Sequence, residues 1–201
     1  MKQKIIALTG ARQTGKTTVA QLLAGKGWQV LGFRALVATE VAEAWRVDVR
    51  MLTDQHTQEW PIPALAFGNC SEPGFARWVA DGGDSLTEPR SPGQVLREFA
   101  AWRQRADPAY FIRQVVRSIS RTLGGGWPRV VVDDVTTPAQ AEALRGVGAK
   151  VVRVHRPLLA CDGVAGNVVP RLHAIEADAD LLNDSGLQAL AASAVECVEV
   201  L

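Results

Sequence analysis

The segment Gly10-Ala11-Arg12-Gln13-Thr14-Gly15-Lys16-Thr17 fills every fixed position of the Walker A pattern G-x-x-x-x-G-K-[ST]. The apolar run before it, at 4–9, is typical of a short buried strand, and residues 17–24 have the apolar spacing of a helix. A glycine loop between a strand and a helix is the setting in which this pattern holds the phosphates of a nucleoside triphosphate. The segment therefore predicts a P-loop that binds a nucleoside triphosphate.

Each part of this loop has an expected role. Glycine at two positions lets backbone N–H groups surround phosphate oxygens, and the positive end of the following helix points at the same charge. Lys16, expected to be exposed in the loop, would reach the β- and γ-phosphates, and the Thr17 hydroxyl would bind Mg²⁺. The residues expected to bind the nucleotide are Gly10, Arg12, Gln13, Thr14, Gly15, Lys16, Thr17 and Thr18.

Strand and helix signals alternate along the rest of the chain. Apolar runs that indicate further short strands lie at 28–33, 129–134, 150–155 and 181–182. Helices are expected after 33 and over 91–103, 107–124, 137–146 and from 187 onward. This alternation predicts an α/β fold, with a parallel sheet covered by helices on both faces and ligands at the carboxyl ends of the strands.

Two segments break the alternation. From about 48 to 91, prolines and glycines interrupt any regular pattern, so we expect a loop-rich insertion. The segment at about 156–176 has the length and composition of a lid. Loops of this length inside a compact domain are usually functional. The 201 residues therefore predict one domain with two functional additions.

Composition excludes several classes of protein. The apolar runs are shorter than the roughly 18 residues that suggest a membrane span, and Met1-Lys2-Gln3-Lys4 leads into the first strand without a signal peptide. We therefore expect a soluble, cytoplasmic protein with no membrane partner. A net charge of +1 gives no basis for a nucleic-acid partner. Three cysteines without C-x-x-C spacing indicate neither disulfides nor zinc; they are Cys70, Cys161 and Cys197.

Two acids follow the valine run at 130–132. Asp133 and Asp134 stand where a Walker B acid is expected, and at least one should hold Mg²⁺ directly or through water. Asp133 is preferred because it directly follows the valines. The alternative interpretation is that one of the two acids only caps the turn into the helix at 137.

Arginines of the expected lid are candidates for catalysis. Arg156 and Arg171 would close onto the phosphates and stabilise charge in the transition state. Arg156 is preferred because it lies at a strand end; surface salt bridges are the alternative. His155 and His173 are interpreted as structural, because a phosphate acceptor is already nucleophilic and needs no general base.

These motifs, in this order, resemble the deoxynucleoside monophosphate kinase family, which is found largely in bacteriophages. The resemblance covers most of the chain, and only the P-loop is specific by itself. The other segments that carry it are 33–36 (FRAL), 91–96 (SPGQVL), 105–112 (RADPAYFI), 131–135 (VVDDV), 141–145 (AEALR), 154–157 (VHRP), 173–176 (HAIE) and 182–186 (LNDSG).

The resemblance implies transfer of the ATP γ-phosphate to the 5′-phosphate of a deoxynucleoside monophosphate, with Mg²⁺. The region from about 34 to 113 would hold that acceptor. Arg34, Arg97 and Arg105 are the candidate phosphate ligands, because the guanidinium fork binds phosphate oxygens bidentately. Trp102 or Phe67 would stack on the base, although such aromatics are more often part of a core.

The chain departs from the family pattern within the acceptor region. Gly93 stands where arginine is common, and Ala100-Ala101-Trp102 replaces a Gly-Thr-Glu sequence. Two other functions stay open: a kinase for another small metabolite such as dephospho-coenzyme A, and a nucleotide-dependent switch or assembly protein. The absence of an N-K-x-D motif weakens the GTP-binding form of the switch. The sequence leaves open the base, the sugar and the oligomeric state, with a homodimer as one alternative.

Overall fold

The computed structural model describes residues 3–54, 56–157 and 174–201. The chain forms two compact units. The first contains Met1–Phe33 and Gln114–Leu201, and the second contains Arg34–Arg113. Each unit is described by itself.

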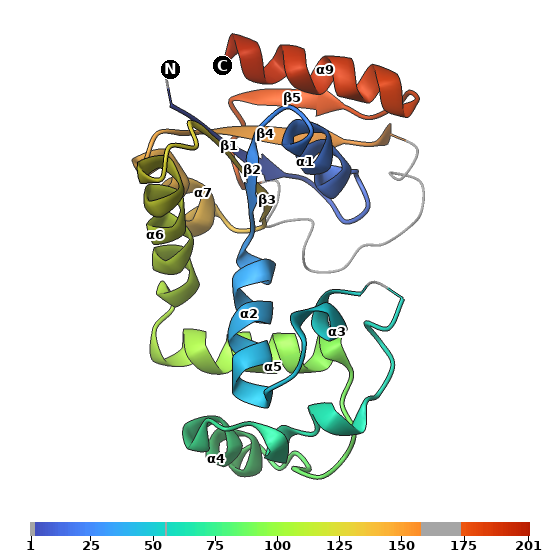
Figure 1. Ribbon diagram of the computed structural model, residues 1–201, viewed down its shortest axis with the longest axis vertical. Coiled ribbons are helices and arrows are strands. Elements are labelled where there is room, and N and C mark those ends of the chain that lie inside the picture. The colour runs from blue at the N-terminus through green and yellow to red at the C-terminus, as the bar shows by residue number, and fades with distance from the viewer. Residues whose placement is uncertain (1–2, 55, 158–173) are drawn as a thin grey trace. The chain divides into compact units, whose positions relative to one another are not determined.

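A five-stranded parallel sheet is the centre of the first unit (Figure 1). Its strands, in spatial order, are β2 (Gln29–Leu31), β3 (Arg129–Val135), β1 (Lys4–Thr9), β4 (Ala149–His155) and β5 (Ala179–Leu182). Every neighbouring pair is parallel. The predicted α/β fold is therefore confirmed, and β1 lies between β3 and β4, where a ligand crevice is expected in such sheets.

Helices cover both faces of this sheet. On one face, Ile6 and Leu8 of β1 share a buried cluster with residues of α1 (Lys16–Ala24) and α9 (Leu187–Val200). The alternate residues Ile5 and Ala7 are buried as well. Because side chains alternate across a strand, the second face is also covered. Helix α7 (Pro138–Gly146) contacts strand β4 of this sheet.

Local sequence explains where α7 begins. The Thr137 hydroxyl accepts a hydrogen bond from the Gln140 N–H at 3.2 Å, and the Gln140 side chain accepts one from the Thr137 N–H at 3.1 Å. This is a capping box, and Pro138 occupies the first helical position. The helix follows β3 directly, so its start is fixed at the end of the strand that carries the two acids.

The second unit contains helices even in the stretch at 48–91, where a loop-rich insertion is expected and where loops do join the short elements. That stretch contains α3, two 3₁₀ turns and α4, because Pro73 begins a helix at its first turn and does not break one. The helix predicted at 91–103 runs three residues further, and the one predicted from 107 begins at 110. The elements are α2 (Phe33–Trp45), α3 (Val49–Thr53), η1 (Pro63–Leu65), η2 (Phe67–Asn69), α4 (Pro73–Asp81), α5 (Pro92–Ala106) and α6 (Tyr110–Gly124), of which α6 continues into the first unit.

Aromatic rings form the core of the second unit. The Phe75 ring lies 5.3 Å from that of Trp45, 5.6 Å from Phe67 and 5.7 Å from both Phe99 and Trp102, centroid to centroid. Phe67 is only 1% exposed, so the expectation that it stacks on a base is wrong for this conformation. No helix in the described ranges is long and apolar enough to cross a bilayer.

Candidate nucleotide-binding site

The loop between β1 and α1 has the backbone of a phosphate cradle. Three of its residues have positive φ: Gly10 (142°), Gln13 (64°) and Gly15 (102°). Side-chain-bearing residues rarely adopt such angles, and Gln13 does so within a loop of predicted function. A Cβ on Gly10 would lie 2.4 Å from the backbone oxygen of Val154, so no other residue fits there.

The start of α1 is open to an anion. Gly15 is the N-cap residue and has no side chain with which to cap the helix, and the first turn contains no acid. The backbone N–H groups of the first turn of α1, and the positive end of the helix dipole, are therefore available to phosphate oxygens. The Thr14 hydroxyl instead donates to the backbone oxygen of Ala11 at 3.0 Å, and Thr14 is buried, so its side chain stabilises the loop. Arg12, Gln13 and Thr17 are exposed, and Thr18 is half-buried.

Lys16 is less exposed than the sequence suggested. It is the first residue of α1 and half-buried, and its Nζ donates to the backbone oxygens of Gly10 at 2.9 Å and Ala11 at 2.6 Å. Burial lowers the pKa of Lys16, and the negative charges of Asp133 and Asp134 offset part of that effect. The ammonium group therefore lies at the mouth of the loop, in the electrostatic field of both acids.

The two acids come to the loop through strand pairing. Thr9 at the end of β1 is in register with Val135 of β3, which places Asp133 and Asp134 at the carboxyl edge of the sheet beside the P-loop. Burial, together with the charge of Asp134, raises the pKa of Asp133 to about 6. A divalent cation would relieve this unfavourable pairing of carboxylates.

The acids have different local partners. Asp134 Oδ1 accepts a hydrogen bond from the backbone N–H of Phe33 at 2.8 Å, so it caps the start of α2. The alternative interpretation, in which an acid caps the helix at 137, is wrong because Thr137 caps that helix. The backbone of residue 32 lies close to the Asp133 carboxylate. Glycine permits this, since a Cβ there would lie 2.7 Å from Asp133 Oδ1. Strand β2 ends at Leu31, short of the predicted 33, because α2 begins at Phe33.

Asn183 is a site residue to which the sequence assigned no role. It follows β5, its backbone N–H donates to the oxygen of His155 at 2.7 Å, and its side-chain Nδ2 donates to the oxygen of Thr14 at 2.8 Å. A Cβ on Gly15 would lie 2.5 Å from the same Nδ2. Asn183 therefore packs directly on the P-loop.

The expected Mg²⁺ ligands are chemically suited to that ion. No group of three or more His, Cys, Asp or Glu that could hold a metal occurs in the part of the chain that the structure describes. A P-loop site does not need one, because it shares Mg²⁺ among a loop hydroxyl, an acid and phosphate oxygens. In such a site Thr17 would supply the hydroxyl and Asp133 or Asp134 the carboxylate, and this assignment stays a prediction.

Most of the predicted lid lies outside the described residues. Arg171 and His173 are among the residues that the structure does not describe. Arg156 is described: it is exposed and directly follows β4. His155 Nε2 lies 2.7 Å from Asp180 Oδ1 in an exposed pair, in keeping with a structural role.

The candidate acceptor residues lie in the second unit. Arg34 donates to the side-chain oxygen of Gln58, while Arg97 and Arg105 are exposed on α5. Trp102 is half-buried and packs on Phe75 and Phe99, so its ring belongs to the aromatic core. Their assignment to an acceptor stays a prediction.

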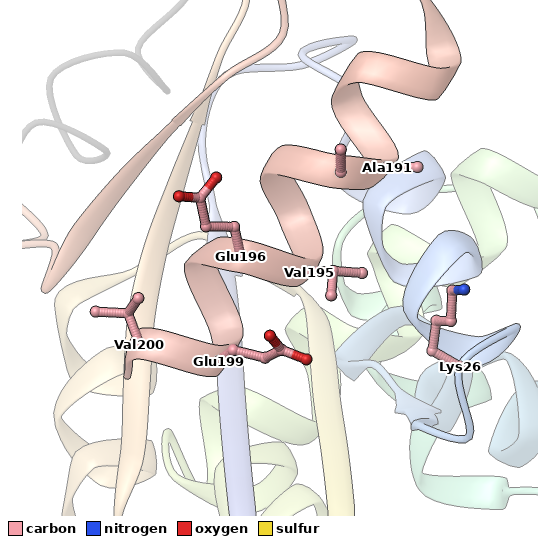
Figure 2. A pocket seen from close by; sticks show the side chains of 7 residues that line it. Lys26, Ala191, Val195, Glu196, Glu199 and Val200 are labelled. Atoms are coloured by element: carbon pink, nitrogen blue, oxygen red, sulfur yellow. The ribbon is translucent and has the colours of Figure 1, made fainter.

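A separate hollow of about 430 Å³ lies at the opposite end of α1 from the P-loop (Figure 2). Alanine and valine side chains of α9 line it, together with Glu196, Glu199 and Lys26. Neither the P-loop nor the start of a helix lines it, so it does not have the features of a nucleotide site.

Solved structures of other proteins share this fold. The chain is similar over its whole length to the crystal structure of TT1252 from Thermus thermophilus (TM-score 0.52, 21% identity, 98% of that chain covered). It is similar over 98% of its length to dephospho-CoA kinase from Campylobacter jejuni (TM-score 0.51, 10% identity, 96% of that chain covered). At these identities the likeness extends to the fold alone. No protein-family model and no curated protein matches the sequence.

Proposed function

We propose that this protein is an ATP-dependent kinase that phosphorylates a (deoxy)nucleoside monophosphate to the diphosphate. The observation that carries the proposal is the convergence of Lys16, the open start of α1 and two carboxylates at the carboxyl end of β3, which pairs with β1. These are the parts that phosphoryl transfer requires, because its catalysis consists mainly of positioning and charge stabilisation.

In the proposed reaction, an oxygen of the acceptor 5′-phosphate attacks the γ-phosphorus of ATP. A new P–O bond forms, and the bond to the β,γ-bridging oxygen breaks, so that ADP leaves with that oxygen. The ionised acceptor brings no proton that a base must remove. Lys16 would exchange the Gly10 and Ala11 oxygens for phosphate oxygens, and Arg156 would add positive charge.

Thr17 and Asp133 would hold Mg²⁺, which neutralises charge on the β- and γ-phosphates when bound. Asp134 would keep its bond to the Phe33 N–H and so fix the beginning of α2. Arg34 and Arg97 in the second unit would bind the acceptor phosphate through their guanidinium groups.

The acceptor is the less supported half of the proposal. Dephospho-coenzyme A is a second candidate because a kinase for that compound shares the fold. The test is ADP formation from Mg-ATP with each nucleoside monophosphate, with dephospho-coenzyme A and without acceptor. Turnover that depends on a monophosphate supports the proposal; turnover only with dephospho-coenzyme A replaces the acceptor. ATP binding without acceptor-dependent turnover favours a nucleotide-dependent switch.

A further inference from the structure

Trp60 is an exposed aromatic residue of the second unit. It is 66% exposed, although tryptophan is highly buried on average in folded proteins. The other phenylalanine, tyrosine and tryptophan residues described at 34–54 and 56–113 are buried or half-buried. Among them are Trp102 and Phe67, the sequence-based candidates for stacking on a base, which pack in the aromatic core. Trp60, and not those two residues, is therefore accessible to a ligand.

Hydrogen bonds fix the backbone on either side of this ring. The Trp60 N–H donates to the backbone oxygen of Thr57 at 3.0 Å. The Ile62 N–H donates to that of Arg90, also at 3.0 Å. Pro61, between them, has a restricted φ. Binding to a ring on a fixed backbone costs less conformational entropy than binding that must first order a loop, so the exposed indole is preorganised.

The segment that carries Trp60 lies against the start of α5. The Gln58 backbone oxygen accepts a hydrogen bond from the Gly93 N–H at 2.9 Å. A Cβ on Gly93 would lie 3.0 Å from that oxygen and 3.7 Å from Arg97 Nη1. Glycine at 93 thus permits the close contact. Arg97 is exposed one helical turn further along α5, so an exposed guanidinium and an exposed indole come from two segments in direct contact.

An indole and a guanidinium match the two ends of a nucleoside monophosphate. The flat base of such a compound can stack on an aromatic side chain, and its phosphate accepts bidentate hydrogen bonds from arginine. A sugar phosphate has no aromatic ring, so it would use the arginine alone. The pair of side chains therefore favours an acceptor that has both a phosphate and a base.

We propose that Trp60 stacks on the base of the acceptor while Arg97 binds its phosphate. This inference rests on the proposed function and deepens it, because it requires that the acceptor carry an aromatic base. Every base has a π face, so stacking on Trp60 gives affinity for a base without selecting one of the four.

The first test compares Michaelis constants. Trp60→Ala should raise the KM for the acceptor monophosphate about tenfold, because base stacking is lost, and leave the KM for ATP within about twofold of wild type. Trp60→Phe keeps an aromatic ring and should raise the acceptor KM less than about threefold. Trp127→Ala is the matched control and should change neither KM, since Trp127 is a 49% exposed tryptophan of the first unit.

The second test uses the fluorescence of the stacked ring and does not depend on the folding of Trp60→Ala. A base stacked on an indole quenches its emission, so the acceptor monophosphate should quench the tryptophan fluorescence of wild-type protein and of Trp127→Phe. The quench should be largely lost in Trp60→Phe. An unchanged acceptor KM in Trp60→Ala, equal rises in both KM values, or a full quench in Trp60→Phe would overturn the inference and leave the kinase proposal intact. Wild-type protein that phosphorylates no monophosphate would overturn both.

Discussion

The Asn183 side chain donates a hydrogen bond to the backbone oxygen of Thr14 at 2.8 Å, across 169 positions of sequence. It holds the P-loop from outside, on the carbonyl side, and so leaves the N–H groups of the loop to phosphate. Asn183→Ala should weaken ATP binding about fivefold, the cost of one hydrogen bond, with the melting temperature changed by only a few degrees. Nucleotide titration by calorimetry checks this, with Gln188→Ala on the exposed side of α9 as control. Equal affinities would show that the loop keeps its conformation without Asn183.

Gly10 should be the least replaceable glycine of the loop. Gly10→Ala combines a φ of 142° with a contact of 2.4 Å to the Val154 oxygen, so we expect a loss of about 2–4 kcal/mol in the free energy of unfolding. Urea denaturation measures it. The matched control is Gly146→Ala, where a Cβ would have nothing within 4 Å and should change stability by less than about 1 kcal/mol. Similar losses in both variants would refute the steric argument.

The two acids should differ in their effect on Mg²⁺. Asp133→Asn removes the preferred carboxylate ligand and should raise the Mg²⁺ concentration for half-maximal turnover about 10- to 100-fold. Asp134→Asn keeps an oxygen that can accept the Phe33 N–H, so we expect a smaller rise. Steady-state assays at varied Mg²⁺ compare the two. A larger effect at Asp134 would reverse the assignment.

The raised pKa of Asp133 predicts a pH-dependent stability. Its folded-state pKa of about 6 lies above the ordinary 3.8, so the ionised carboxylate costs folding free energy. That cost is absent below pH 3.8, grows as the pH rises, and is complete above about pH 6. Asp133→Asn should therefore stabilise the metal-free protein by about 1–2 kcal/mol at pH 7.5, allowing for solvent screening, and by progressively less as the pH falls toward 4. Melting curves across this range check the sign; stabilisation that grows toward low pH would contradict it.

Lys16 is the residue on which we expect phosphate binding to depend most. Lys16→Ala should abolish turnover because it removes the ammonium group that is expected to contact the β- and γ-phosphates. Its two bonds to loop oxygens are lost as well, so we expect a modest drop in melting temperature and not full retention of stability. Circular dichroism and turnover measured on the same preparation separate the two effects. Full activity in Lys16→Ala would refute the mechanism.

The sequence predicted the first unit better than the second, for a physical reason. Strands β1 and β3 contain uninterrupted apolar runs, and the P-loop glycines lie between a strand and a helix, so the pattern and the motif agree. In α4 the proline at 73 was read as a breaker, although proline is favoured in the first turn of a helix. The buried residues of α4 are Phe75 and Val79. They form a single apolar pair spaced four residues apart in a nine-residue helix, which is a weak signal for a helix.

The site was predicted only where residues lie close together in sequence. Lys16 and the acids belong to known motifs, but the contact of Asn183 with Thr14 joins distant segments and leaves no spacing signal. Gly32 and Gly93 have the same property, because a close approach to a distant residue explains them and no local pattern does.

The central claim is that the P-loop of this protein transfers phosphate to a nucleoside monophosphate. The most direct test is ADP release from Mg-ATP by purified wild-type protein with each deoxy- and ribonucleoside monophosphate, dephospho-coenzyme A and no acceptor. The account predicts turnover that depends on at least one monophosphate and is lost in Lys16→Ala. Tight ATP binding with no rise above the acceptor-free rate for any monophosphate would contradict it.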